Sequence, residues 1–209
     1  MRYLFFLEKK MADSSFDYIL VLDFEATCIQ DKVIPNQEII EFPVVCLNGQ
    51  TGEVMWEFHR YVKPEYNPKL SSFCTELTGI TQNMVQNEDV FKDTLRSFTA
   101  KLLEENILRS NKTFTFVTVG DWDLHTALPK QCKLSDMRVP IYFRKWINIK
   151  VPFKEHYGRK TGLVGMLTHL GMKFEGNPHS GIDDTRNTVR IVQRMIGDGI
   201  KLENTSWLY

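Results

Sequence analysis

The sequence predicts an α/β fold in which helices cover the faces of a mixed β-sheet. The first observation is a run of five apolar residues at 18–22, typical of a central strand buried on both faces. The second is the Asn-Gly pair at 48–49, which indicates an antiparallel hairpin between two β-rich segments. The third is a helical stripe of apolar residues between 91 and 102, which would cover one face of the sheet.

The first three predicted strands form a meander. They cover residues 18–22, 38–47 and 54–62, and the Asn-Gly pair makes the third strand antiparallel to the second. The polar segment between the first two strands is expected to be a loop. Pro43 has no backbone N–H to donate, so we expect a bulge or an unpaired position there.

Helices and strands alternate in the rest of the chain. A helix is expected at 90–108, because its apolar residues recur at i, i+4, i+7 and i+11 from Phe91. A β-branched and aromatic run at 113–119 predicts the fourth strand. The other expected elements are a helical turn at 73–81 closed by Gly79, a short helix at 124–132 broken by Pro129, a short fifth strand at 145–149, a helix at 163–170, and a last helix from about Gly181 to Ile196.

The composition is that of a globular protein. With 209 residues, of which 43% are hydrophobic, the chain is long enough for one well-filled core. A second methionine, Met11, suggests that residues 1–15 form a flexible N-terminal extension and that 16–209 form a single domain. Lys+Arg and Asp+Glu each number 26, which counts mildly against a passive nucleic-acid binder, since no net positive charge attracts phosphates.

The cysteine pattern argues against two classes of site. The four cysteines stand far apart without a C-x-x-C pair, so a zinc ribbon and a redox motif are not indicated. Reduced thiols in an intracellular protein of the cytoplasm, the nucleus or both are expected. No stretch approaches the ~18 apolar residues of a membrane span, and the short apolar run at 3–7 lacks a cleavage site. We expect a monomer that does not bind membranes.

Two carboxylates stand at the end of the first strand. Because side chains alternate along a strand, Asp23 and Glu25 point the same way and Phe24 points to the opposite face. Two like charges at the end of a buried strand are costly unless a cation neutralises them. Mg²⁺ or Mn²⁺, which prefer oxygen ligands, suit such a pair. By itself the D-x-E pattern also fits two solvated carboxylates.

Further titratable residues are expected at the same edge of the sheet. Asp123 follows the fourth strand, and if that strand is parallel to the first, their carboxyl ends share one crevice. Asp184 begins the stripe of the last helix that packs on the sheet, and His179 precedes it in the loop. Four carboxylates from three elements, with one imidazole, form a far more specific pattern than D-x-E.

These residues resemble a known family. The stretch 23–28, the Trp122-Asp123 pair and the His179-x4-Asp184 spacing are similar to the three motifs of the DEDDh (DnaQ-like) 3′-to-5′ exonucleases, in particular the Eri-type branch. The resemblance runs from about Tyr18 to the C-terminus. It implies a ribonuclease-H-like fold with a mixed five-stranded sheet flanked by helices. The histone-mRNA member of this branch carries an N-terminal helical module, for which this chain has no room, so its substrate preference is not carried over.

The resemblance also implies a reaction and a set of roles. Hydrolysis of a phosphodiester would use two Mg²⁺ or Mn²⁺ ions ~4 Å apart, with Asp23 bridging them. His179 would be the general base that takes a proton from the attacking water, and the product would be a 5′-nucleoside monophosphate. The residues implied as catalytic metal ligands are Asp23, Glu25, Asp123 and Asp184. The alternatives are Asp121, two residues before Asp123, and Asp183, directly before Asp184, and the family spacing favours Asp123 and Asp184.

Substrate contacts follow from the same resemblance. The backbone at Ala26 and Thr27 lies where the family holds the terminal ribose and its 3′-hydroxyl. Trp122 would stack on the terminal base, a contact worth ~1–3 kcal/mol, with core packing as the alternative. Basic residues between 144 and 160 form either an edge that follows the phosphates or a solvated loop. Glu41 is either a buried carboxylate that steadies the site or an exposed strand residue.

The sequence therefore favours a two-metal 3′-to-5′ exonuclease that acts on RNA with a free 3′ end, with DNA as a possible second substrate. One alternative is a scaffold that keeps the fold and works through binding partners. Another is an endonuclease of the ribonuclease H kind, against which the His179-x4-Asp184 spacing argues. The histidines at 59, 125, 156 and 169 are expected to be structural or exposed, and 201–209 to be an ordinary tail.

Overall fold

The computed structural model describes residues 16–209, so the extension expected at 1–15 lies outside the described residues. At its centre, β1 (Tyr18–Leu22) lies between β3 (Ile39–Asn48) and β5 (Phe114–Thr118). β3 is antiparallel to both β1 and β4 (Val54–Tyr61), which is the predicted meander, while β5 is parallel to β1 and to β6 (Lys145–Asn148). These five strands form the predicted mixed sheet.

Two short strands extend this sheet beyond the prediction. β2 (Glu25–Ala26) pairs with β3, and β7 (Ser206–Trp207) pairs antiparallel with β6. The expectation of an ordinary tail at 201–209 was therefore wrong. A strand of two residues is too short to show an alternating pattern, and it forms here because β6 offers unpaired backbone groups along its edge.

Pro43 occupies the predicted unpaired position. On one side of β3 the register with β2 ends at Glu41 and the register with β1 begins at Val44. Within the described residues Pro43 therefore has no partner on that side, while on the other side it faces His59 of β4. Because Pro43 lies where β3 changes its partner from β2 to β1, its missing N–H removes no hydrogen bond between strands on that side.

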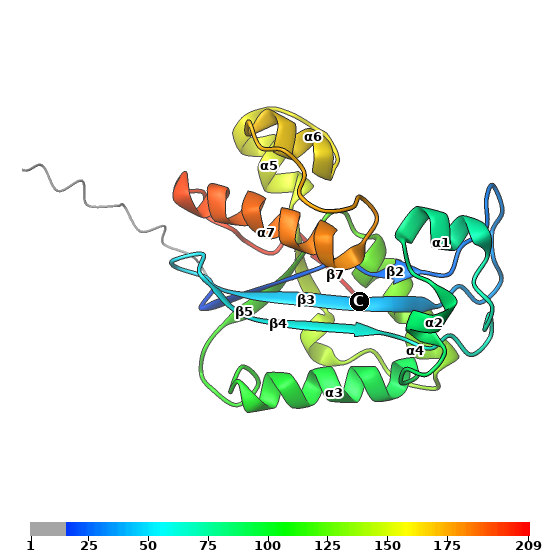
Figure 1. The fold of residues 1–209 in the computed structure, drawn as a ribbon. Coiled ribbons are helices and arrows are strands. Elements are labelled where there is room, and N and C mark those ends of the chain that lie inside the picture. The colour runs from blue at the N-terminus through cyan, green and yellow to red at the C-terminus, as the bar shows by residue number, and fades with distance from the viewer. Residues whose placement is uncertain (1–15) are drawn as a thin grey trace, which may run out of the picture.

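One face of the sheet is covered by α3 (Phe91–Glu104), as Figure 1 shows. The four residues of its predicted stripe are all buried, and Phe98 packs against Phe42 of β3 with ring centroids 5.1 Å apart. Leu20 and Leu22 of β1 belong to the same apolar cluster. Burial of this stripe is the main reason that the segment is helical, since an isolated helix of this length is marginal in water.

The opposite face is covered by α7 (Gly181–Gly197), with α5 (Lys150–Tyr157) and α6 (Leu163–His169) on the same side (Figure 1). Ile19 and Val21 of β1 lie in this second apolar cluster. The sequence did not predict α5, because its basic residues hid a weak apolar pattern, and its proline is tolerated within the first helical turn. Of the basic residues between 144 and 160, Lys150 and Lys154 lie on this helix and Lys145 lies on β6, while Arg159 and Lys160 follow the helix in a loop.

The helix expected at 124–132 is not broken by its proline. A π-helical turn, η1 (Trp122–Ala127), continues directly into α4 (Leu128–Leu134). The N–H of Leu128 donates to the carbonyl of Asp123, one residue farther back than in an α-helix. Pro129 then stands in the first turn of α4, where its missing N–H is not required. The expectation of a break at Pro129 was wrong.

The remaining elements are short. The predicted helical turn is α1 (Ser72–Thr78), which Ser71 caps at its start and Gly79 ends in the left-handed conformation at φ 75°. α2 (Gln82–Val85) and the 3₁₀ turn η2 (Ile141–Phe143) were not predicted. No helix within residues 16–209 has the length and apolar character needed to cross a membrane.

Candidate active site

The carboxyl ends of β1 and β5 meet at one edge of the sheet, on the right in Figure 1. Asp23 directly follows β1, and Glu25 begins β2 two residues later. Phe24 between them turns into the core, where its ring lies 4.8 Å from that of Phe42. The predicted alternation therefore leaves both carboxylates on the side away from Phe24.

Asp123 is tied directly to this pair. It lies in the first turn of η1, and its Oδ1 accepts a hydrogen bond of 2.8 Å from the backbone N–H of Phe24. The alternative, Asp121, points elsewhere, since its carboxylate accepts bonds from Trp146 Nε1, Asn148 Nδ2 and the Ser206 hydroxyl. The structure therefore brings Asp123 beside Asp23 and Glu25 and uses Asp121 to hold β6 and β7.

Asp184 reaches the same edge from the first turn of α7. Its Oδ2 accepts a hydrogen bond of 3.1 Å from the backbone N–H of His179. His179 has a φ of 66°, in a left-handed region that residues other than glycine rarely adopt, so the surrounding loop holds it there. The neighbouring Asp183 instead accepts a bond from the N–H of Asn177 and braces that loop.

The pKa values of these carboxyls reflect their mutual repulsion. Burial, followed by the charges of Asp123, Asp184, Glu25 and Glu41, raises the pKa of Asp23 well above its usual value. Burial and the charges of three of the same neighbours raise the pKa of Glu25 to about 9. The four predicted carboxylates thus face one another across a common space.

The pKa values of Asp123 and Asp184 are raised less, because each carboxylate is stabilised by a hydrogen bond from a backbone N–H and by a nearby basic side chain. Burial raises the pKa of Asp123 to about 6, while the Phe24 N–H and the Lys150 ammonium lower it. Burial likewise raises the pKa of Asp184 to about 6, and the N–H and imidazole of His179 lower it. The Lys150 ammonium and the His179 imidazole therefore lie at the margin of the carboxylate cluster.

The donor set suits hard divalent cations. Four crowded carboxylates offer the oxygen ligands that Mg²⁺ and Mn²⁺ prefer, and such an ion would relieve their repulsion. Among residues 16–209, no three Asp, Glu, His or Cys side chains already converge closely enough to hold one ion. Mg²⁺ is commonly held by only one or two carboxylates, with water completing its coordination. The chemistry of the residues fits the expected cofactor.

Glu41 was predicted to be either a buried carboxylate that steadies the site or an exposed strand residue, and the structure shows that it is buried. It is 1% exposed, and its oxygens accept bonds of 2.9 and 3.1 Å from the backbone N–H groups of Gly181 and Ile182. His59 contributes a third bond of 2.8 Å. A carboxylate at this position satisfies the unpaired N–H groups of a helix N-terminus, so Glu41 anchors the start of α7 to β3.

Gly181 is a site residue that the sequence reasoning did not assign. A Cβ at this position would lie 2.8 Å from the carbonyl oxygen of Asp23 and 3.0 Å from Glu41 Oε2. Any side chain would therefore push the first turn of α7 away from the sheet, and Asp184 would move with it. A glycine that opens a helix two residues before a pair of aspartates was the signal available in the sequence.

Replacing Glu41 by Ala is expected to lower the free energy of unfolding by about 2 kcal/mol. Two buried N–H groups lose their acceptor at about 1–3 kcal/mol each, and relief of the repulsion between Glu41 and Glu25 offsets part of this loss. Chemical denaturation measures the change. Glu57→Ala, which removes an exposed ion pair with Arg186, is the matched control and should cost less than about 1 kcal/mol. Equal losses in both variants would contradict the anchoring role.

The pKa values predict an unusual pH dependence of stability without divalent ions. A carboxyl with a raised pKa destabilises the folded state once it ionises, so the penalty is absent at low pH and grows as pH rises toward the folded-state pKa. Glu25, whose pKa is raised from 4.5 to about 9, should lower thermal stability in EDTA as pH rises through this range, and Asp184, whose pKa is raised from 3.8 to about 6, should add to the loss only below about pH 6. Melting curves at several pH values, with and without Mg²⁺, test this. Stability that increases with pH in EDTA across this range would contradict the repulsion.

The predicted substrate contacts differ in their availability. Ala26 and Thr27 are buried, and the Thr27 N–H and carbonyl already bond to Glu38 and to the Gln37 side chain. Because Gln37 Nε2 already donates to the Thr27 carbonyl, a substrate hydroxyl could bind this carbonyl only as its second hydrogen-bond donor. Trp122 is 40% exposed at the start of η1, so core packing is not its role.

Comparisons with known proteins agree with this site. Residues 20–192 match a family model described as exonuclease (RNase_T). ERI1 exoribonuclease 3 from Homo sapiens is 43% identical over 193 residues, and 3′-5′ exoribonuclease 1 from Homo sapiens is 43% identical over 203 residues. These matches cover 91% and 93% of this chain, and they span 57% of the length of each relative.

A solved structure of the nuclease domain of 3′hExo, described as a DEDDh family member bound to rAMP, also matches. The TM-score is 0.90 and the sequence identity 41%, over 94% of this chain and 100% of that domain. The similarity therefore extends over nearly the whole described fold, including the edge of the sheet where the carboxylates gather.

Proposed function

Since the chain belongs to this exonuclease (RNase_T) family, we propose that it is a metal-dependent 3′-to-5′ exoribonuclease acting on RNA with a free 3′ end. The observation that carries the proposal is the cluster of Asp23, Glu25, Asp123 and Asp184 at one edge of the sheet, beside His179. The names of the relatives support RNA as the substrate, and the rAMP bound to the related nuclease domain is consistent with it.

Each site residue receives a role in this proposal. The four carboxylates would hold two divalent ions, Mg²⁺ or Mn²⁺, and such ions would neutralise charge at the phosphorus and lower the pKa of the attacking water. The charges of the other three carboxylates all raise the pKa of Asp23, which supports its role as one of the ligands that would hold the ions. The His179 imidazole takes the proton from the water, and Trp122 offers an exposed face for the terminal base.

The fold positions these groups without substrate. Asp123 is held by the Phe24 N–H, the start of α7 by Glu41, and the backbone of His179 by Asp184. Such bonds leave few rotations to be lost when the phosphodiester binds, which favours catalysis by positioning.

A labelled strand tests the proposal directly. With Mg²⁺ or Mn²⁺, the protein should shorten a 5′-labelled single-stranded RNA stepwise and release 5′-nucleoside monophosphates, while EDTA should stop the reaction. A circular RNA of the same sequence should stay intact, because an exonuclease requires an end. Cleavage of the circle would instead indicate an endonuclease, and activity in EDTA would remove the role of the metal ions. A matched DNA strand measures how strongly the 2′-hydroxyl is selected.

We further propose that the protein works as a monomer inside the cell, in the cytoplasm, the nucleus or both. Its four cysteines are free thiols, and three of them are buried, which is consistent with a reducing compartment. Imaging of the tagged full chain and light scattering of the purified protein test location and mass.

A further inference from the structure

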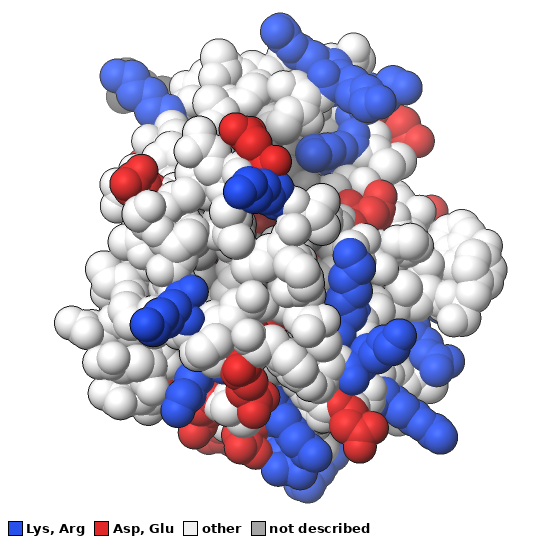
Figure 2. All heavy atoms as spheres, turned by 90° about the vertical axis from the view of Figure 1, so that its right-hand side faces the viewer, with Lys and Arg blue, Asp and Glu red and all other residues white. Residues whose placement is uncertain are grey.

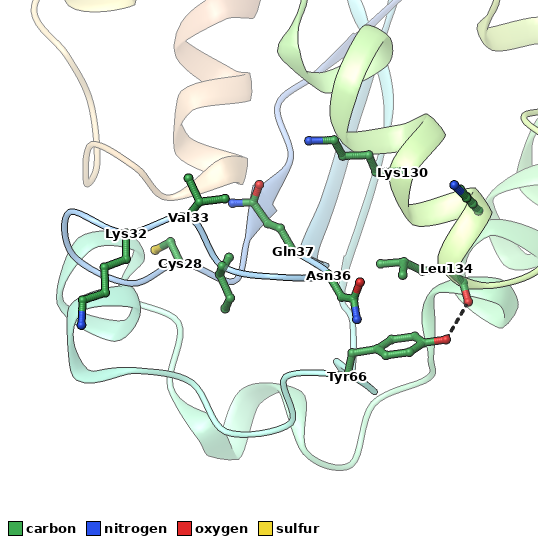
Figure 3. A pocket seen from close by; sticks show the side chains of 10 residues that line it. Cys28, Lys32, Val33, Asn36, Gln37, Tyr66, Lys130 and Leu134 are labelled. Atoms are coloured by element: carbon green, nitrogen blue, oxygen red, sulfur yellow. Dashed lines mark hydrogen bonds between the residues drawn. The ribbon is translucent and has the colours of Figure 1, made fainter.

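A pocket of about 630 Å³ lies between two segments that follow site carboxylates in the chain, and none of the four carboxylates lines it. Figure 3 shows its walls, which are the loop that follows β2 on one side and α4 on the other. Lys130 extends from α4 toward Gln37, and the ring of Tyr66 closes the opposite end. The lining of the pocket includes Cys28, Lys32, Gln37, Tyr66, Lys130 and Lys133.

Both walls of the pocket start at a catalytic carboxylate. Cys28 follows Glu25 by three residues, a distance of at most about 11 Å along an extended chain. On the other side, η1 carries Asp123 and continues without a break into α4. Lys130 comes seven residues after Asp123, or about 10 Å along a helix. An RNA strand whose 3′ end lies at the carboxylate cluster therefore reaches the pocket within a short distance.

The walls are braced by hydrogen bonds. The Gln131 side chain, between the two lysines of α4, accepts a bond of 2.7 Å from the N–H of Ile39 in β3. The buried Glu38 carboxylate accepts bonds from three successive backbone N–H groups at 65–67, which fixes the segment that carries Tyr66. The Tyr66 hydroxyl donates to the carbonyl of Leu134. The pocket is thus formed before any ligand arrives.

The charge of the pocket is one-sided. Lys32, Lys130 and Lys133 are exposed and form no ion pair within residues 16–209, and the lining contains no acidic residue. Figure 2 views this end of the molecule, where Lys and Arg side chains lie among Asp and Glu, so the one-sided charge belongs to the pocket lining and not to the whole face. Tyr66 is 53% exposed and offers an aromatic face. Lysines combined with an exposed aromatic ring are typical of surfaces that bind single strands.

We propose that this pocket binds the nucleotides on the 5′ side of the scissile bond, with Lys130 and Lys133 on their phosphates and Tyr66 against a base. The inference rests on the proposed exonuclease function. It also explains how a chain of zero net charge holds a polyanion, since positive charge is gathered where the strand lies. The basic helix α5, the other candidate for this task, follows β6 and does not line the pocket.

Substrates of different length test the inference. The p-nitrophenyl ester of thymidine 5′-monophosphate occupies only the terminal position, whereas RNA strands of two, four and eight nucleotides extend beyond it. For the double variant Lys130→Glu/Lys133→Glu, we expect KM for the eight-nucleotide strand to rise at least tenfold. Turnover of the ester should remain within twofold of the unaltered protein, which also shows that the variant is folded.

The matched control reverses two charges elsewhere. Arg109 and Lys173 are exposed and lie outside the pocket, so Arg109→Glu/Lys173→Glu changes the net charge equally. Its KM for the long strand should stay within about twofold of the unaltered protein. Equal KM increases in both double variants would mean that only the overall charge matters and would overturn the pocket assignment. Equal losses on the ester and the long strand would place the terminal nucleotide in the pocket instead.

Salt dependence provides a second readout. For single strands, each phosphate contact contributes about 0.7 to the slope of log affinity against log salt. Loss of two contacts in Lys130→Glu/Lys133→Glu should therefore reduce the slope by about 1.4. An unchanged slope would contradict the inference. If the unaltered protein hydrolyses neither the ester nor RNA, the proposed function itself fails, which is distinct from any result for the pocket.

Discussion

Asp184→Asn is expected to lower kcat on single-stranded RNA by about 10³-fold. The substitution keeps the shape of the side chain but removes one of the charges that would hold a divalent ion, and such an ion stabilises the transition state by several kcal/mol. Asp184 lies in the first turn of α7, facing Asp23, and is 9% exposed. Initial rates at saturating RNA and Mg²⁺ measure the effect.

Asp183→Asn provides the matched control, because Asp183 is the next residue on the same turn and points to the loop at Asn177. Its rate should remain within about tenfold of the unaltered protein. Asp184→Asn should also melt at a higher temperature in EDTA, since it removes a carboxyl whose pKa burial and neighbouring charges have raised to about 6. Near-normal activity of Asp184→Asn, or an equal loss in Asp183→Asn, would contradict the assignment.

His179→Ala is expected to lower kcat by about 10²–10⁴-fold, the usual contribution of a general base. The backbone of His179 is held in a left-handed conformation and its N–H donates to Asp184, which places the residue at the margin of the carboxylates while its side chain stays exposed. His156→Ala is the control, since this histidine lies on α5 and contacts Tyr157, and its activity should be unchanged.

Metal binding distinguishes the loss of activity expected for Asp184→Asn from that expected for His179→Ala. His179→Ala should retain most of the thermal stabilisation by Mn²⁺, because the four carboxylates remain, whereas Asp184→Asn should lose most of it. If His179→Ala keeps full activity, another group takes the proton. If it loses the Mn²⁺ effect as completely as Asp184→Asn, His179 acts through the metal site and not as a base.

The elements that could be predicted are those with a repeated pattern. The apolar run of β1, the alternation in β4 and the stripe of α3 each contain enough residues to show their period. The elements that were not predicted are either very short or have an apolar pattern that charged residues obscure. β7 has two residues, and the basic residues of α5 hide its buried face. Pro129 misled for another reason, since the π-turn before it depends on contacts that the local sequence does not show.

The site shows the same division. Asp23, Glu25, Asp123, Asp184 and His179 were identified from their spacing and from the resemblance to a family. The anchoring of α7 by Glu41 and the pocket between the β2 loop and α4 were visible only in the folded chain. The sequence left two roles open for Glu41, a buried carboxylate or an exposed strand residue, and its burial in the folded chain shows that the first is correct.

The sequence by itself therefore determined the order of the elements and the identity of the acidic residues, because periodicity and spacing are local properties of the chain. The family resemblance favoured Asp123 over Asp121, but only the tertiary structure shows why Asp123 faces the cluster, since that depends on the partners that each aspartate finds among residues far away in sequence. Asp121 turns to Trp146 and Asn148, while Asp123 turns to Phe24, 99 residues earlier in the chain. Such choices are made by hydrogen bonds and repulsions that exist only when the strands are side by side.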